Sequence, residues 1–171
     1  MAPVLTLASN GLLLAALAWA VVTDLRSRRI SNRLTYPLMA LGLLSGGLTG
    51  GWGGLRDSAL GWLLGAAILL VPCLLGAVGA GDLKLMAAIG ALKGPEFVLL
   101  AAVYTALAGG VLALVELVRV RGPRLALVYV AGGWLGSVRS ASSAARAGTI
   151  PYGPAIAAGV VIALLRSSLG G

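Results

Sequence analysis

The sequence predicts an all-α polytopic membrane protein, folded as a single domain over residues 1–171. Apolar residues make up 59% of the chain and charged residues only 11%, whereas about a quarter of the residues of a soluble domain are charged. The mean hydropathy is +1.00, and the apolar residues are spread along the whole chain. The 26 glycines fit this class, because small residues let membrane helices pack closely.

Six membrane-spanning helices are expected, because charged residues divide the chain into apolar intervals and a spanning helix needs about 20 apolar residues. Five intervals are close to that length. The sixth stretch, between Asp82 and Glu96, has a short uncharged centre, but its lysines can extend toward the headgroups. The expected spans are roughly residues 4–23, 34–52, 59–80, 83–95, 97–118 and 150–168.

The basic residues give the expected orientation. No basic residue precedes the first span and arginines follow it directly, an order typical of a retained span rather than a cleaved signal peptide. If all six segments cross with both termini outside, in the periplasm, ten basic residues face the cytoplasm and three face outward. Without the span at 83–95 the split is seven to six, so the positive-inside bias favours six spans. The ten are Arg26, Arg28, Arg29, Arg33, Lys84, Arg119, Arg121, Arg124, Arg139 and Arg146.

A cytoplasmic loop is expected at residues 119–149. Within its 125–146 segment, Leu127, Ala131, Trp134 and Val138 fall at helical spacing between flanking arginines. This pattern fits a helix lying on the membrane surface. It fits equally well a plain loop, and the sequence leaves both readings open.

The charge and the cysteine content exclude several classes of function. The net charge is +8, but the arginines lie between apolar runs, where topology signals occur, rather than on a basic face that would bind nucleic acid. There is no histidine and one cysteine, Cys73, inside an apolar run. We therefore expect no disulfide, no metal site and no cofactor, and we interpret Cys73 as a small buried apolar residue.

Two of the five acidic residues are candidates for chemistry, because a carboxylate in or beside a membrane span is costly. Asp57 and Glu96 fall in predicted outer loops, where they are solvated charges. Glu116 precedes Arg119 by three residues, which an ion pair on the helix surface explains. Asp24 and Asp82 remain.

Each of these two aspartates also has a simpler explanation when taken alone. Asp24 could be an acid at headgroup level, paired with the arginines that follow it. Asp82 could be the N-cap of the helix that begins after it, since aspartate is favoured there.

Together, the two aspartates suggest catalysis, because the predicted topology places both at the cytoplasmic ends of their helices and at similar depth. Two carboxyls that meet at a partly dehydrated interface share a proton. The ionised one can then take a proton from water while the protonated one polarises a peptide carbonyl. Gly79 and Gly81, in Gly79-Ala80-Gly81-Asp82, would let a substrate backbone approach the second acid.

Three blocks of the sequence resemble the type IV prepilin peptidases, which are intramembrane aspartic proteases with a Gly-x-Gly-Asp motif. The first block is Asp24 to Thr35, which looks like the first-aspartate loop of the family. The second is Gly79 to Leu85 and contains Lys84, the counterpart of the motif lysine. The third, Ile150-Pro151-Tyr152-Gly153-Pro154, is similar to the segment that opens the last span of the family.

The resemblance implies that Asp24 and Asp82 are the catalytic aspartates of an endopeptidase in the bacterial inner membrane. Its substrates would be prepilins or pseudopilins, cut after a short basic leader at the cytoplasmic face. Lys84 would either tune the aspartate pair or extend to the headgroups.

Two departures from the family pattern accompany the match. The sequence lacks the paired cysteines of the N-methyltransferase domain that many members carry, so no methylation is expected and the chain resembles the short, protease-only subgroup serving Flp-type pili. Ser31 stands where the family commonly has proline.

Three other functions compete with this reading. A small transporter or channel would use two acids facing each other near the middle of the membrane. A non-catalytic subunit of a pilus or secretion apparatus would tolerate replacement of both aspartates. A signal-peptide-peptidase-like enzyme shares Gly-x-Gly-Asp, but its Pro-Ala-Leu motif is missing here.

Overall fold

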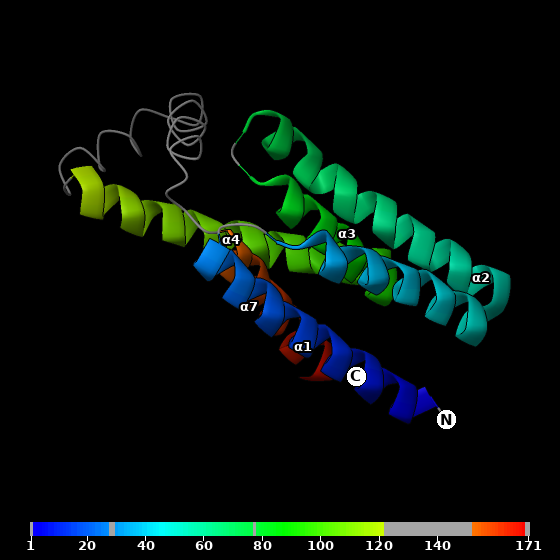
Figure 1. Ribbon diagram of the computed structural model, residues 1–171. Helices are drawn as coiled ribbons and strands as arrows, with labels where there is room; N and C mark the ends of the chain where they lie inside the picture. The colour runs from blue at the N-terminus through cyan, green and yellow to red at the C-terminus, as the bar shows by residue number, and fades with distance from the viewer. Residues whose placement is uncertain (1, 28–29, 77, 122–151, 170–171) are drawn as a thin grey trace.

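The computed structural model of the chain is built from helices in every part that it describes, residues 2–27, 30–76, 78–121 and 152–169. The prediction of an all-α fold is confirmed for these residues. The helices, whose arrangement Figure 1 shows, are α1 (Ala2–Ser27), α2 (Asn32–Leu74), α3 (Ala80–Lys93), α4 (Pro95–Arg121) and α7 (Gly153–Leu169).

Helix α2 folds back on itself at Gly51 and so forms two antiparallel limbs (Figure 1). Gly51 has φ 58° and ψ −139°, a backbone conformation that glycine adopts without steric cost. The limbs are in close contact, since the Ser58 hydroxyl donates a hydrogen bond to the Gly42 carbonyl at 3.3 Å. The limbs overlap the segments in which the second and third spans were expected. The second limb ends at Leu74, earlier than residue 80, because Gly76 follows with φ 73° and such a residue ends helices.

Helix α3 lies against both limbs of α2, and glycine makes the close approach possible. A Cβ on Gly42 in the first limb would lie 2.6 Å from the Ala91 carbonyl carbon of α3. A Cβ on Gly61 in the second limb would lie 2.1 Å from the Gly90 carbonyl oxygen. Along the first limb, Asn32 contacts Lys84 and Gly42 contacts Ala91, so this limb runs parallel to α3. Along the second limb, Gly61 meets Gly90 and Gly65 meets Met86, so this limb runs antiparallel. As a result α3 is the most enclosed helix described, and residues 85–91 are all buried.

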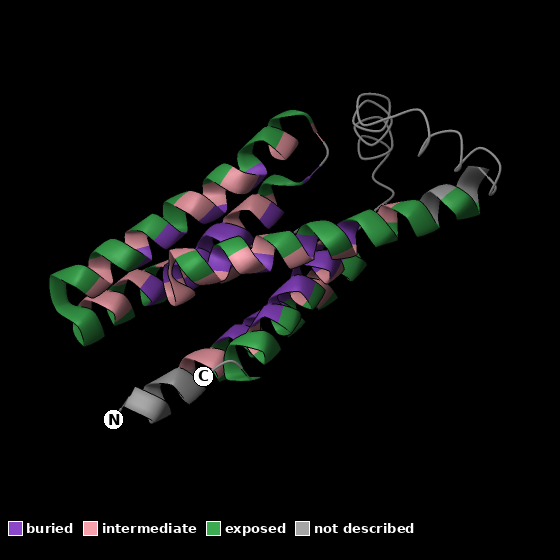
Figure 2. Ribbon diagram, turned by 180° about the vertical axis from the view of Figure 1, so that it is seen from behind, coloured by how far each residue is buried: buried purple, intermediate pink, exposed green. Residues whose placement is uncertain are grey.

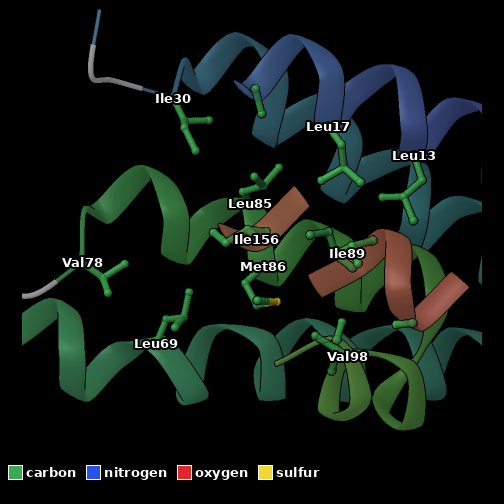
Figure 3. Close-up of a cluster of buried hydrophobic side chains, with 14 residues drawn as sticks. Leu13, Leu17, Ile30, Leu69, Val78, Leu85, Met86, Ile89, Val98 and Ile156 are labelled. Carbon is green, nitrogen blue, oxygen red and sulfur yellow. The ribbon is translucent and has the colours of Figure 1, made fainter. Parts of the chain in front are cut away.

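Helix α7 packs against α4 and α1 (Figure 1), and its buried residues, which lie between Gly153 and Ala163, join the core. A Cβ on Gly159 of α7 would lie 2.4 Å from the Thr105 amide of α4, so these backbones also touch. The largest group of buried apolar side chains draws on all five described helices. Figure 2 marks the buried residues along the helices, and Figure 3 shows the side chains of this group. It includes Leu13 and Leu17 of α1, Leu69 of α2, Leu85, Met86 and Ile89 of α3, Val98 of α4 and Ile156 of α7.

The outer surface of the helices is apolar, as expected of a chain surrounded by lipid. Leu48 is 86% exposed, Trp52 84% and Trp19 63%, and an aqueous surface rarely carries so many large apolar side chains together. Among the described residues, two helices are long and apolar enough to cross a membrane, Asn32–Leu74 and Pro95–Val115, while Gly153–Leu169 is apolar but shorter. The count of six spans and the periplasmic position of both termini stay predictions.

Some expectations fall on residues that the structure does not describe. Most of the predicted cytoplasmic loop at 119–149, including the 125–146 segment, lies within residues 122–151. The side chain of Glu116, expected to pair with Arg119, is also outside the described part of the chain.

Candidate active site

Asp24 lies near the end of α1 and is buried against the start of α7, with 6% of its surface exposed. The backbone N–H of Gly153, the first residue of α7, donates a hydrogen bond to Asp24 Oδ2 at 2.8 Å. The first amides of a helix lack partners within the helix and carry a partial positive charge. This position therefore suits a negatively charged carboxylate, and Asp24 is not simply an acid solvated at headgroup level.

Asp82 is the third residue of α3 and is 7% exposed. Its Oδ2 accepts a hydrogen bond from the Gly79 N–H at 3.2 Å. The N-cap of α3 is Gly79, in an extended conformation, so the reading of Asp82 as an N-cap is wrong by three positions. Asp82 Oδ1 is buried and has no hydrogen-bond partner within the described residues.

The two carboxyls are close enough to interact electrostatically. Asp82 lies between the expected spans 59–80 and 83–95. The pKa of its carboxyl is raised to about 7. Burial is the main cause, and the charge of Asp24 is the second, while the hydrogen bond from Gly79 lowers the pKa. Near neutral pH the side chain of Asp82 therefore retains a proton much of the time.

The glycines of the motif allow two close contacts inside the protein. A Cβ on Gly81 would lie 3.0 Å from the Ile30 Cβ, so Gly81 lets the segment before α2 rest on the start of α3. A Cβ on Gly79 would lie 3.1 Å from Asp82 Oδ2, beside the hydrogen bond that Gly79 donates. The approach of a substrate backbone at these glycines stays a prediction.

Lys84 is engaged with α2 rather than with the aspartates. Its Nζ donates a hydrogen bond to Asn32 Oδ1 at 2.9 Å and lies 5.0 Å from the centre of the Tyr36 ring. Lys84 thus ties the start of α3 to the start of α2, both of which flank the site.

Two further residues border the site. Gly153 contacts Asp24, and Tyr152, directly before it, is partly buried and interacts electrostatically with Asp82. The sequence singled out this segment only through its resemblance to the opening of a last span. Periodicity and spacing carry no signal that it would touch α1, because that contact depends on how α7 docks.

The arrangement provides two buried carboxyls, each beside a backbone amide donor, and the pKa of one of them, Asp82, is raised to about 7. Such a pair can act as an acid and a base toward a single bond. Within the described parts of the chain, no group of three or more His, Cys, Asp or Glu residues is placed to hold a metal ion.

Comparison with known families gives a match. The model of the type IV leader peptidase family matches residues 11–114, a range that contains Asp24, Gly79, Gly81, Asp82 and Lys84 and ends before α7. No curated protein and no solved structure matches the chain.

Proposed function

The chain belongs to the type IV leader peptidase family, whose members are aspartic prepilin peptidases, and we propose that Asp24 and Asp82 are its catalytic pair. The observation that carries the proposal is that α1 and α3 bring two buried, electrostatically coupled carboxyls together. The substrates are prepilins or pseudopilins of the Flp type, which lose a short basic leader.

The two carboxyls take different roles in the proposed reaction. Asp24 is the ionised base, because the Gly153 amide stabilises its negative charge. Asp82 is the acid, because its Oδ1 is buried without a partner and its pKa is raised to about 7.

Hydrolysis then proceeds by acid–base catalysis. Asp24 takes a proton from water as the water oxygen bonds to the scissile carbonyl carbon, and Asp82 donates its proton to the carbonyl oxygen. When the tetrahedral intermediate collapses, the carbonyl re-forms and returns a proton to Asp82. The C–N bond breaks, and the proton held by Asp24 passes to the leaving amine. The products are the leader, with a new carboxyl end, and the pilin, with a new amino end.

The location of the pair supports cleavage at the cytoplasmic face. Asp24 lies at the C-terminal end of α1, and Asp82 lies at the N-terminal end of α3. The same helix ends also carry basic residues, namely Arg26 near the end of α1, Arg33 at the start of α2 and Lys84 near the start of α3. Basic residues gather on the cytoplasmic side of inner-membrane proteins. Acids at a helix end also fit a peptidase better than a transport path through the middle of the bilayer.

Replacement of each aspartate tests the proposal. Asp24→Asn and Asp82→Asn should each reduce leader cleavage by on the order of 100-fold or more, because either change removes an acid or a base. The measurement is the ratio of cleaved to uncleaved prepilin when enzyme and substrate are co-expressed.

The matched control is Asp57→Asn, the same change at an exposed carboxylate, which should leave cleavage at the wild-type rate. Normal processing by Asp24→Asn or Asp82→Asn would instead favour an assembly subunit. Both variants should still accumulate in the membrane, since a buried amide costs less than an unpaired charge.

A further inference from the structure

We propose that Gly153 is a positioning residue for Asp24, holding one carboxylate oxygen with its amide so that the other oxygen is presented to water. The proposal rests on the catalytic pair inferred above. Gly153 lies beyond the region that matches the family model, which ends at residue 114.

The first observation is the closeness of the contact. The Gly153 N–H lies 2.8 Å from Asp24 Oδ2. A Cβ at position 153 would lie 2.7 Å from that oxygen, 3.0 Å from Asp24 Cβ and 3.1 Å from Asp24 Cγ. The side chain of Asp24 therefore occupies the space that any larger residue at 153 would need.

The second observation is that the start of α7 offers Asp24 a single donor. Residue 154 is proline, which has no N–H. The amides of Ala155 and Ile156 both donate to the Tyr152 carbonyl, at 3.0 and 3.2 Å. The Gly153 amide is thus the donor left at this end of the helix, and one donor engages one carboxylate oxygen. Oδ2 is held, and Oδ1 is the oxygen able to accept the proton of the attacking water.

The third observation is that the preceding residue reaches the other acid. Tyr152 interacts electrostatically with Asp82, and its hydroxyl packs on α4, where a Cβ on Gly109 would lie 2.6 Å from the Tyr152 Oη. Two consecutive residues at the start of α7 therefore border both aspartates. The docking of α7 on α1 and α4 fixes where Asp24 stands relative to Asp82.

The charged surroundings of Asp24 can be identified for each helix that packs on α1. Asp82 faces it from α3, and Tyr152 lies at the start of α7. On the side of α2, Arg33 is exposed, and Lys84 of α3 is turned to Asn32. Among the described residues, the titratable groups near Asp24 are thus Asp82 and Tyr152.

Gly153→Ala in the full-length enzyme tests the proposal. The added Cβ should displace the Asp24 carboxylate from the amide and lower kcat for leader cleavage by on the order of 100-fold, the cost of a misplaced catalytic group. KM should stay within about threefold of wild type, since the change removes no substrate contact.

Two other glycines provide controls for the same substitution. Gly110→Ala adds a Cβ with no heavy atom within 4 Å and should behave as wild type. Gly159→Ala places a Cβ 2.4 Å from the Thr105 amide, in the interface of α4 and α7. It should lower thermal stability, but the folded fraction should keep the wild-type kcat.

A backbone ester at position 153, made by incorporating glycolic acid, removes the N–H without adding an atom. It keeps the test valid even if Gly153→Ala does not fold. The ester should reproduce the lower kcat with a KM close to that of the wild type. A wild-type kcat in the ester would overturn the proposal, as would a Gly153→Ala enzyme that only loses stability like Gly159→Ala. If Asp24→Asn also cleaved normally, the catalytic pair itself would be wrong. If Asp24→Asn were inactive while the ester behaved as wild type, only the role proposed for Gly153 would be wrong.

Discussion

At the scale of single residues, the two aspartates stand in unequal environments. Asp24 faces the amide of Gly153 at 2.8 Å, whereas Asp82 has a longer bond at 3.2 Å and a buried oxygen without a partner in the described chain. A buried oxygen without a donor disfavours the charged form of a carboxyl. The inequality gives each acid one role, as in other carboxyl pairs whose surroundings separate their protonation.

A pH dependence follows from the raised pKa of Asp82. Asp82 acts while protonated, and its pKa is about 7, so the acid form is present below that pH and is lost above it. Leader cleavage should therefore fall as the pH rises through about 7, even though water becomes easier to deprotonate. Initial rates between about pH 5.5 and pH 9 measure this. A rate that stays level or increases to pH 9 would contradict the role of Asp82, whereas Asp57→Asn should follow the wild-type profile throughout.

The candidate pair could be predicted from the sequence because acids are rare in so apolar a chain, and few remain once the loop charges are set aside. The surroundings of the pair could not. The start of α3 at Ala80 makes Asp82 the third residue of that helix rather than its cap. The contact of Asp24 with Gly153 joins residues far apart in the sequence, and no local pattern encodes it.

At the scale of the helices, hydropathy predicted where helical segments lie more accurately than where those helices begin and end. Arg56 and Asp57 interrupt the apolar intervals, so the second and third spans were expected to stop short of them. The structure reverses the chain at Gly51 instead and carries both charged residues on the second limb of α2. Charged residues are excluded from the hydrocarbon of the membrane, but they are not excluded from helices. They therefore mark where a membrane span ends and not where a helix ends.

Helix α3 shows the same effect. The uncharged centre of α3 is short, yet the helix runs from Ala80 to Lys93. The helix can include its two lysines because both form hydrogen bonds with polar side chains of other helices. Lys84 bonds to Asn32, and Lys93 bonds to Ser9 and Asn10 of α1.

The packing of α3 on α2 predicts the effect of one added methyl group. Gly61→Ala places a Cβ 2.1 Å from the Gly90 carbonyl oxygen, so the two backbones must separate. The expected cost is about 1–3 kcal/mol, seen as a lower unfolding temperature of the purified protein in detergent. Gly53→Ala, where a Cβ meets nothing within 4 Å, should be neutral or slightly stabilising, because alanine favours helix. Equal unfolding temperatures for the two variants would contradict the close packing.

At the scale of the whole molecule, the described helices give the protein two chemically different ends. One end carries Asp24, Asp82 and the start of α7. The other end carries Lys93 with Ser9 and Asn10, and Arg166, which donates a hydrogen bond to the Tyr104 hydroxyl at 2.8 Å. Composition predicted the helices. The arrangement that brings Asp24 and Asp82 to one end depends on glycine contacts between helices, which composition does not specify.

This polarity predicts which positions face the periplasm, and single cysteines can test it. In a Cys73→Ser background, Asp57→Cys and Ser168→Cys should react with a membrane-impermeant maleimide applied to spheroplasts, because both residues are exposed at the end away from the aspartates. Ser27→Cys, beside Asp24 at the other end, should react only after lysis, because the basic residues near it predict that this end faces the cytoplasm. Cleavage of co-expressed prepilin by each variant controls for correct insertion. Labelling of Ser27→Cys in intact spheroplasts would place the aspartate pair in the periplasm and contradict leader removal at the cytoplasmic face.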